Sequence, residues 1–116
     1  MIQEMGQSKD NVLGYRVVGD VTKDDYGTLV PQVEAVVKQF GAIRVLFDLS
    51  DFTWEKADAW KADLGFGKEF KGSIERMALV GQESWGKYMA KIAQPFYAQQ
   101  VKWFEDEDKA WTWVKS

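Results

Sequence analysis

The sequence predicts an α/β domain: a mixed open sheet of about five strands, with about four helices packed on it. Apolar segments with the composition of strands alternate with segments of helical periodicity. The run Ile43–Leu49 is apolar almost throughout, which is typical of a strand covered on both faces. The chain has 116 residues and no internal repeat or linker, so residues 1–116 are predicted to form a single domain.

Five segments are predicted to be strands because β-branched and aromatic residues dominate them and turn residues bound them. They are Ile2–Met5, Val12–Asp20, Ile43–Leu49, Glu75–Gly81 and Val101–Glu105. A polar turn over residues 6–11 separates the first two strands, so we expect them to form a hairpin. The later strands alternate with helices, which implies crossover connections.

The first predicted helix begins at Thr22, whose side chain can cap it, and ends at Gly41. Asp24 and Asp25 suit the positive end of the helix dipole. Pro31 lies inside the periodic segment, so we expect either a kink there or a later start. Further helices are predicted over residues 54–70, 84–96 and 106–116.

The sequence contains neither His nor Cys. It therefore lacks the commonest general base, the thiolate nucleophile and the usual ligands of zinc. The net charge is −3, and the lysines are scattered between acids rather than gathered in the basic stripe of a nucleic-acid surface. We therefore expect no enzyme activity, no cofactor, no metal and no nucleic-acid partner.

The sequence also bears on location. It has no run of the roughly 18 apolar residues that a membrane-spanning helix needs. The N-terminal segment, MIQEMGQSKDNV, is too polar for a secretory signal. We expect a cytoplasmic protein, and peripheral membrane contact stays open as an alternative.

The predicted helix over residues 54–70 has two apolar faces. One face carries Ala57, Trp60, Leu64 and Gly67, and the opposite face carries Ala59, Ala62, Phe66 and Phe70. Exposing Trp60 and Phe66 together to water would cost on the order of 7–12 kcal/mol. An ordinary surface helix needs one apolar stripe, so the second stripe requires a further neighbour: another helix, a second subunit, a ligand or a membrane.

Short motifs follow one another in a definite order along nearly the whole chain. They are Asp25-Tyr26, Asp48-Leu49-x-Asp51-Phe52, Trp60 with Asp63-Leu64 and Phe66-Gly67, Ile74-Glu75-Arg76, Val80-Gly81 before Trp85, Ala93-x-Pro95-Phe96, Phe104 and Ala110-x-x-Trp113. In this ordered set the sequence resembles the SpoIIAA-like family. The resemblance implies the STAS-type fold, which is similar to the lipid-binding part of CRAL-TRIO domains.

The likeness to CRAL-TRIO domains and the two-faced helix together predict a pocket for a nonpolar small molecule or lipid. We expect the pocket between the predicted helices 54–70 and 84–96, with the first of them as a mobile cover. Its predicted lining residues are Trp54, Ala57, Trp60, Leu64, Phe66, Trp85, Met89, Ile92 and Phe96. A homodimer or a peripheral membrane contact are the alternatives for the same apolar surface.

The resemblance also implies an alternative function. STAS proteins of the anti-anti-sigma type bind a kinase partner and are switched by phosphorylation of a serine. That serine position falls at Ala57 here, and the neighbouring Asp58 lacks the charge and geometry of a phosphate, so we do not expect this switch. The alternative is therefore a protein-interaction module without the phosphorylatable serine. Its predicted partner-binding residues are Asp48, Ser50, Asp51, Phe52, Trp54 and Asp58.

Overall fold

The computed structural model describes residues 1–55, 65–82 and 97–116 of the chain. The strands are β1 (Ile2–Glu4), β2 (Val12–Val21), β3 (Ile43–Glu55), β4 (Ile74–Val80) and β5 (Gln100–Phe104). The helices are α1 (Lys23–Phe40) and α4 (Glu107–Lys115), and residues 65–70 form a further helical segment before β4. The predicted helix over residues 84–96 lies outside the described residues.

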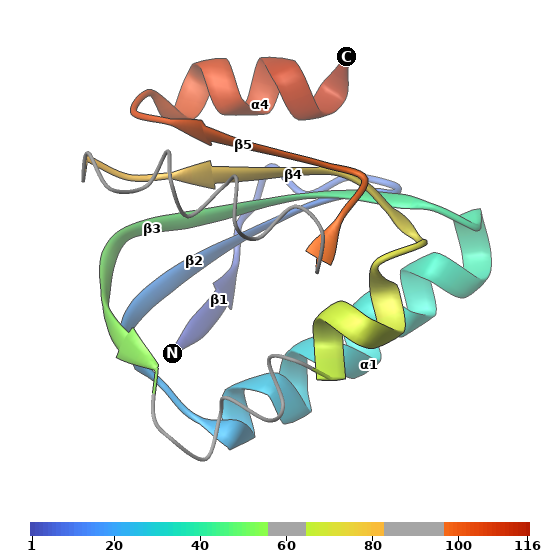
Figure 1. The fold of residues 1–116 in the computed structure, drawn as a ribbon, viewed down its shortest axis with the longest axis horizontal. Helices are drawn as coiled ribbons and strands as arrows, with labels where there is room; N and C mark the ends of the chain where they lie inside the picture. The colour runs from blue at the N-terminus through green and yellow to red at the C-terminus, as the bar shows by residue number, and fades with distance from the viewer. Residues whose placement is uncertain (56–64, 83–96) are drawn as a thin grey trace.

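The strands form one five-stranded sheet in the order β1-β2-β3-β4-β5 (Figure 1). β1 runs antiparallel to β2, as expected for a hairpin, and each remaining pair of neighbours is parallel. Each parallel pair needs a crossover connection between its strands. The mixed open sheet predicted from the sequence is therefore confirmed.

Helices cover both faces of the sheet (Figure 1). α1 and the helical segment 65–70 lie on one face, and α4 lies on the other. The buried side chains form two clusters, which divide in the same way. Val45 belongs to the cluster under α1, whereas its neighbour Leu46 belongs to the cluster under α4. Because successive side chains point to opposite faces of a strand, this division explains why β3 is apolar almost throughout its first half.

A capping box fixes the start of α1. The Thr22 hydroxyl accepts a hydrogen bond from the backbone N–H of Asp25, and the Asp25 carboxylate accepts one from the backbone N–H of Thr22. The helix begins at Lys23 and continues through Pro31, so the alternative of a later start is wrong. Gly41 ends the helix with a φ of 83°, a backbone conformation that favours glycine.

β3 is longer than predicted. We expected a strand ending at Leu49, then a turn and a helix from Trp54, but β3 continues to Glu55. The physical reason is pairing, because β2 extends to Val21 and pairs in parallel with residues 51–55 of β3. The hydrogen bonds of this ladder outweigh the preference of Asp and Ser for turns.

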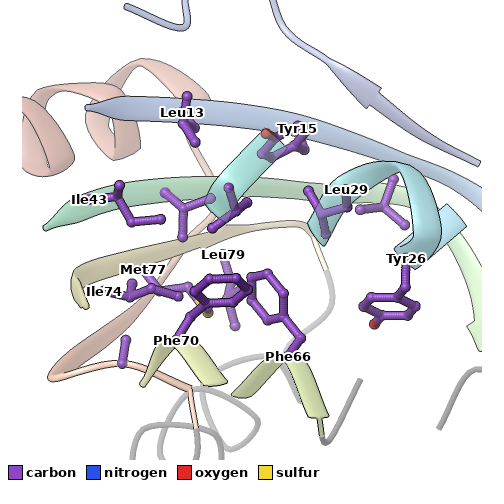
Figure 2. Close-up of a cluster of buried hydrophobic side chains, with 14 of the residues drawn as sticks. Leu13, Tyr15, Tyr26, Leu29, Ile43, Phe66, Phe70, Ile74, Met77 and Leu79 are labelled. Atoms are coloured by element: carbon purple, nitrogen blue, oxygen red, sulfur yellow. The ribbon is translucent and has the colours of Figure 1, made fainter. Parts of the chain in front are cut away.

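Within the helical segment 65–70, the described part of one predicted apolar face, Phe66 and Phe70, is buried in this chain. Phe66 and Phe70 are 4% and 3% exposed. The centroid of the Phe66 ring lies 5.1 Å from that of Phe70 and 6.5 Å from that of Tyr26 in α1. Figure 2 shows both phenylalanine rings directed into the buried cluster that contains Met77. For this face, the neighbour required by the sequence pattern is therefore the core of the same chain.

α4 packs on the opposite face of the sheet. Its Trp111 ring is 4% exposed and lies against the backbone of Gly14 in β2. Arg44 and Arg76 reach from the sheet and donate hydrogen bonds to two carbonyl groups in the last turn of α4, at 3.2 and 2.7 Å. Because a helix end leaves such carbonyls without helical partners, the sheet fixes both the packing and the end of α4. No helix of the described segments is long and apolar enough to cross a membrane.

Candidate functional site

The carboxyl ends of the parallel strands define one edge of the sheet. β4 ends at Val80, which pairs with Asp48, whereas β3 continues beyond this point to Glu55. Past Asp48, β2 is the only one of the described strands that pairs with β3. Open α/β sheets hold their binding sites at the carboxyl ends of the strands, so residues 48–52, here called the edge segment, are the first candidate for a site.

The edge segment contains a β-bulge. Arg16 of β2 pairs with Asp48, but Val18 pairs with Asp51, so β3 has one residue more than β2 over this interval. The backbone N–H of Ser50 donates a hydrogen bond of 3.0 Å to Asp48 Oδ1. This bond lies inside the bulge, where the ladder between the two strands is interrupted. The conformation of the edge segment therefore depends on the position of the Asp48 side chain.

Asp48 is a buried carboxylate, 6% exposed. Arg16 Nε donates to its Oδ2 atom at 3.1 Å. The same arginine also contacts α4: its Nη2 atom lies 3.4 Å from Oε1 of Glu107 in the first turn of that helix. A buried charge is tolerated where it is paired and hydrogen-bonded, and these contacts supply that pairing. Three side chains thus connect β2, β3 and α4.

The electrostatics of the pair favour two charged groups. Burial has the largest single influence on Asp48 and raises its pKa, but hydrogen bonds from Ser50 and Arg16 together with the Arg16 charge outweigh it, so the pKa lies below the ordinary value of 3.8. The hydrogen bond to Asp48 is also the main reason that the pKa of Arg16 is raised. At neutral pH the contact is therefore an ion pair.

The accessible surface of this edge carries several acids, with Arg16 and Lys109 as cations beside them. Ser50 and Asp51 are exposed, and Phe52 is half-buried against the core. The start of α4, joined to the edge segment through Arg16, adds three exposed acids: Glu105, Asp106 and Asp108. The surface thus offers carboxylates to a binding partner, whereas Phe52 packs against the cluster under α1, on the face of the sheet opposite α4.

Among the residues predicted for partner binding, four lie in the edge segment: Asp48, Ser50, Asp51 and Phe52. Their role in binding stays a prediction. Phe66, predicted to line a ligand pocket, is part of the buried core. Nine predicted residues carry side chains outside the described part of the chain: Trp54, Ala57, Asp58, Trp60, Leu64, Trp85, Met89, Ile92 and Phe96.

Sequence reasoning missed Arg16 and Glu107. A signal for Arg16 was present, because this charged residue interrupts an apolar strand between Tyr15 and Val17, both of which are buried. Glu107 carries no comparable signal, since it stands in a run of acids at residues 105–108. Only the packing of α4 on the sheet brings it to Arg16.

The mixed sheet with helices on both faces defines an α/β domain of STAS type. A family model described as SpoIIAA-like matches residues 12–115, and the chain therefore belongs to the SpoIIAA-like family. The family inferred from the ordered motifs is confirmed. The further relation to CRAL-TRIO domains stays a prediction, and a sequence search of curated proteins gave no match.

Solved structures share the fold. An uncharacterized protein from Shewanella loihica PV-4 with a SpoIIAA-like fold superposes with a TM-score of 0.83 at 25% identity, covering 98% of this chain and 92% of that one. The anti-sigma factor antagonist SpoIIAA in its unphosphorylated form gives 0.69 at 13% identity, covering 100% and 99% of the two chains. The phosphorylated form of the Bacillus cell fate determinant SpoIIAA gives 0.59 at 13% identity, covering 94% and 96%.

Proposed function

We propose that this domain is a non-enzymatic protein-interaction module that regulates a partner protein by binding it through the edge segment. The observation that carries the proposal is the exposed pair Ser50 and Asp51, which lies at a bulge whose conformation depends on buried Asp48. A rigid scaffold that presents a few accessible polar residues is the usual construction of a binding site.

The comparisons support a protein partner. The anti-sigma factor antagonist SpoIIAA, whose name describes action on another protein, has a similar fold. At 13% identity this likeness concerns the fold alone, so a regulatory partner is carried over to this chain as part of the proposal. The absence of His and Cys from the sequence supports binding rather than catalysis.

The mode of regulation proposed here differs from a serine switch. By the resemblance to STAS proteins of the anti-anti-sigma type, the position of the phosphorylatable serine falls at Ala57, which has no hydroxyl group. Binding through the edge segment therefore proceeds without phosphorylation at that position. The neighbouring Asp58 carries one permanent negative charge, whereas a phosphate group carries nearly two.

The surface chemistry favours a particular kind of partner. Asp51 and the acidic residues at the start of α4 complement a surface that carries Lys or Arg. Salt screens contacts between exposed charges over a Debye length of about 8 Å at physiological ionic strength. We therefore expect the complex to weaken as the salt concentration rises.

The experiment that tests the proposal is a quantitative capture of partners from cells that produce the protein. We expect the wild-type domain to recover one protein at a stoichiometric level, and Asp51→Lys to lose it. Glu69→Lys is the matched control, because it makes the same change of charge at an exposed position of the helical segment 65–70 and should retain the partner. Equal recovery by Asp51→Lys and Glu69→Lys would show that the edge segment is not the contact surface.

The pocket for a nonpolar molecule remains a sequence-based prediction. Phe66, one of its predicted lining residues, has 4% of its surface exposed because it packs on α1 and the sheet. The rest of the predicted lining consists of side chains outside the described residues. Native mass spectrometry of protein purified from cells tests this hypothesis: we expect a bound lipid if the pocket exists, and a ligand-free mass counts against it.

A further inference from the structure

Arg16 contacts both the edge segment and α4, although it belongs to neither. It lies in β2, and its side chain is 45% exposed while both of its sequence neighbours are buried. Its guanidinium group bonds to Asp48 at 3.1 Å and to Glu107 at 3.4 Å. These partners are 32 and 91 residues away in the sequence, so the contacts depend on the complete fold.

We propose that Arg16 is a positioning residue for partner binding: it holds the Asp48 carboxylate in the orientation that closes the β3 bulge, and it joins the bulge to the start of α4 through Glu107. This inference rests on the proposed function, because it assigns a role in preparing the same binding segment. Arg16 itself need not touch the partner.

The first step in the argument for Arg16 is that the two oxygen atoms of the Asp48 carboxylate accept hydrogen bonds from different donors. Its Oδ2 atom accepts from Arg16 and its Oδ1 atom accepts from the Ser50 backbone N–H. The two oxygen atoms belong to one rigid planar group, so a rotation that releases one bond also misplaces the other. Removing the guanidinium group would leave a carboxylate that is 6% exposed without its charged partner. Such a group turns toward water or takes up a proton; the first change breaks the hydrogen bond to the Ser50 N–H, and the second weakens it.

The second step is the link to α4. Glu107 lies in the first turn of this helix. Asp106 caps the helix, because its side chain accepts hydrogen bonds from the backbone N–H groups of Asp108 and Lys109. The start of α4 is therefore a firm point, and Arg16 connects the bulge to it. In this proposal, a partner seated on Ser50 and Asp51 binds a segment whose conformation Arg16 links to the start of α4.

The test uses hydrogen exchange measured by NMR on the isolated protein, so it does not require a known partner. We expect Arg16→Met to speed up exchange of the Ser50 amide by roughly tenfold or more while the amide of Leu79 in β4 keeps its protection. Arg16→Lys should restore part of the protection, because a lysine can still pair with Asp48. Unchanged Ser50 exchange in Arg16→Met would overturn the inference.

A second arm measures affinity for the captured partner. We expect Arg16→Met to weaken binding about tenfold, Glu107→Gln to weaken it less, and Asp51→Lys to abolish it. Faster Ser50 exchange with unchanged affinity in Arg16→Met would overturn the positioning role while leaving the proposed function intact. Undiminished affinity in Asp51→Lys would instead overturn the proposed function, whatever Arg16 does to the bulge.

Discussion

At the scale of single residues, glycines make room for two tryptophans that are buried in the described part of the chain, Trp103 and Trp111. A Cβ atom added to Gly14 would collide with the Trp111 ring, and one added to Gly81 would lie 2.7 Å from the Trp103 ring. Protein interiors are packed so tightly that even one additional methyl group is felt. Each glycine is thus a requirement of packing, which the sequence alone did not indicate.

We expect Gly14→Ala to lower the free energy of unfolding by about 1–3 kcal/mol, because overpacking forces the Trp111 ring out of its position. Gly6→Ala is the control, since nothing lies within 4 Å of a Cβ atom built there. Urea unfolding of both variants measures the difference. Equal stability of the two variants would contradict the close contact at Gly14.

The lowered pKa of Asp48 implies that the free energy of unfolding depends on pH. This pKa is lowered on folding, so the unfolded chain binds more protons between the folded value and the unfolded value of about 3.9. The stabilisation is therefore complete above the unfolded pKa and is lost as the pH falls through the folded pKa. We expect Asp48→Asn to cost on the order of 1–2 kcal/mol at pH 7, and the cost should shrink as the pH falls below about 4.

The measurement is urea unfolding of the wild type and Asp48→Asn across this pH range. Asp51→Asn, at an exposed position of the same strand, serves as the control and should change stability by less than about 0.5 kcal/mol. A constant difference between the wild type and Asp48→Asn from pH 7 to pH 3 would contradict an ionised Asp48.

At the scale of elements, local signals determined the boundaries of α1. The cap at Thr22 and the stop at Gly41 were both readable from the sequence, because capping depends on residues close in the chain. The end of β3 could not be predicted from such local signals. Residues Asp48–Asp51 have the composition of a turn, and only pairing with β2 keeps them in the strand.

The capping box at Thr22 should contribute measurably to the free energy of unfolding. Thr22→Ala should lower the free energy of unfolding by about 0.5–2 kcal/mol, because it leaves the Asp25 N–H without its side-chain acceptor. Thr28→Ala, at an exposed position inside the same helix, should be neutral or slightly stabilising, because alanine has the higher helix propensity. Thermal unfolding compares the two. Similar losses in both variants would mean that the capping box does not stabilise the helix.

The packing of the helical segment 65–70 should also contribute to the stability of the domain. We expect Phe66→Ala to destabilise the domain by about 3–5 kcal/mol, as for a large aromatic side chain removed from a core. Phe40→Ala, at a ring that is 43% exposed, should cost less than about 1 kcal/mol. Denaturant unfolding monitored by circular dichroism would give both values. A small effect of Phe66→Ala would reopen a role for this ring in a ligand pocket.

At the scale of the whole molecule, the order of strands and helices was enough to predict the mixed open sheet. The alternation of patterns is a property of the entire chain, and it survives errors at individual boundaries such as that of β3. The site was less accessible to prediction. Asp48 and Asp51 were found because they follow an apolar run, whereas Arg16 and Glu107 join them only through long-range contacts.

The proposed binding of a partner protein to the edge segment can be located on the domain directly. The most direct measurement is NMR mapping of the amide shifts that the captured partner causes in the domain. We expect the largest shifts at Ser50, Asp51 and Phe52, with smaller shifts in the first turn of α4. Shifts confined to α1 or to the last turn of α4 would contradict it.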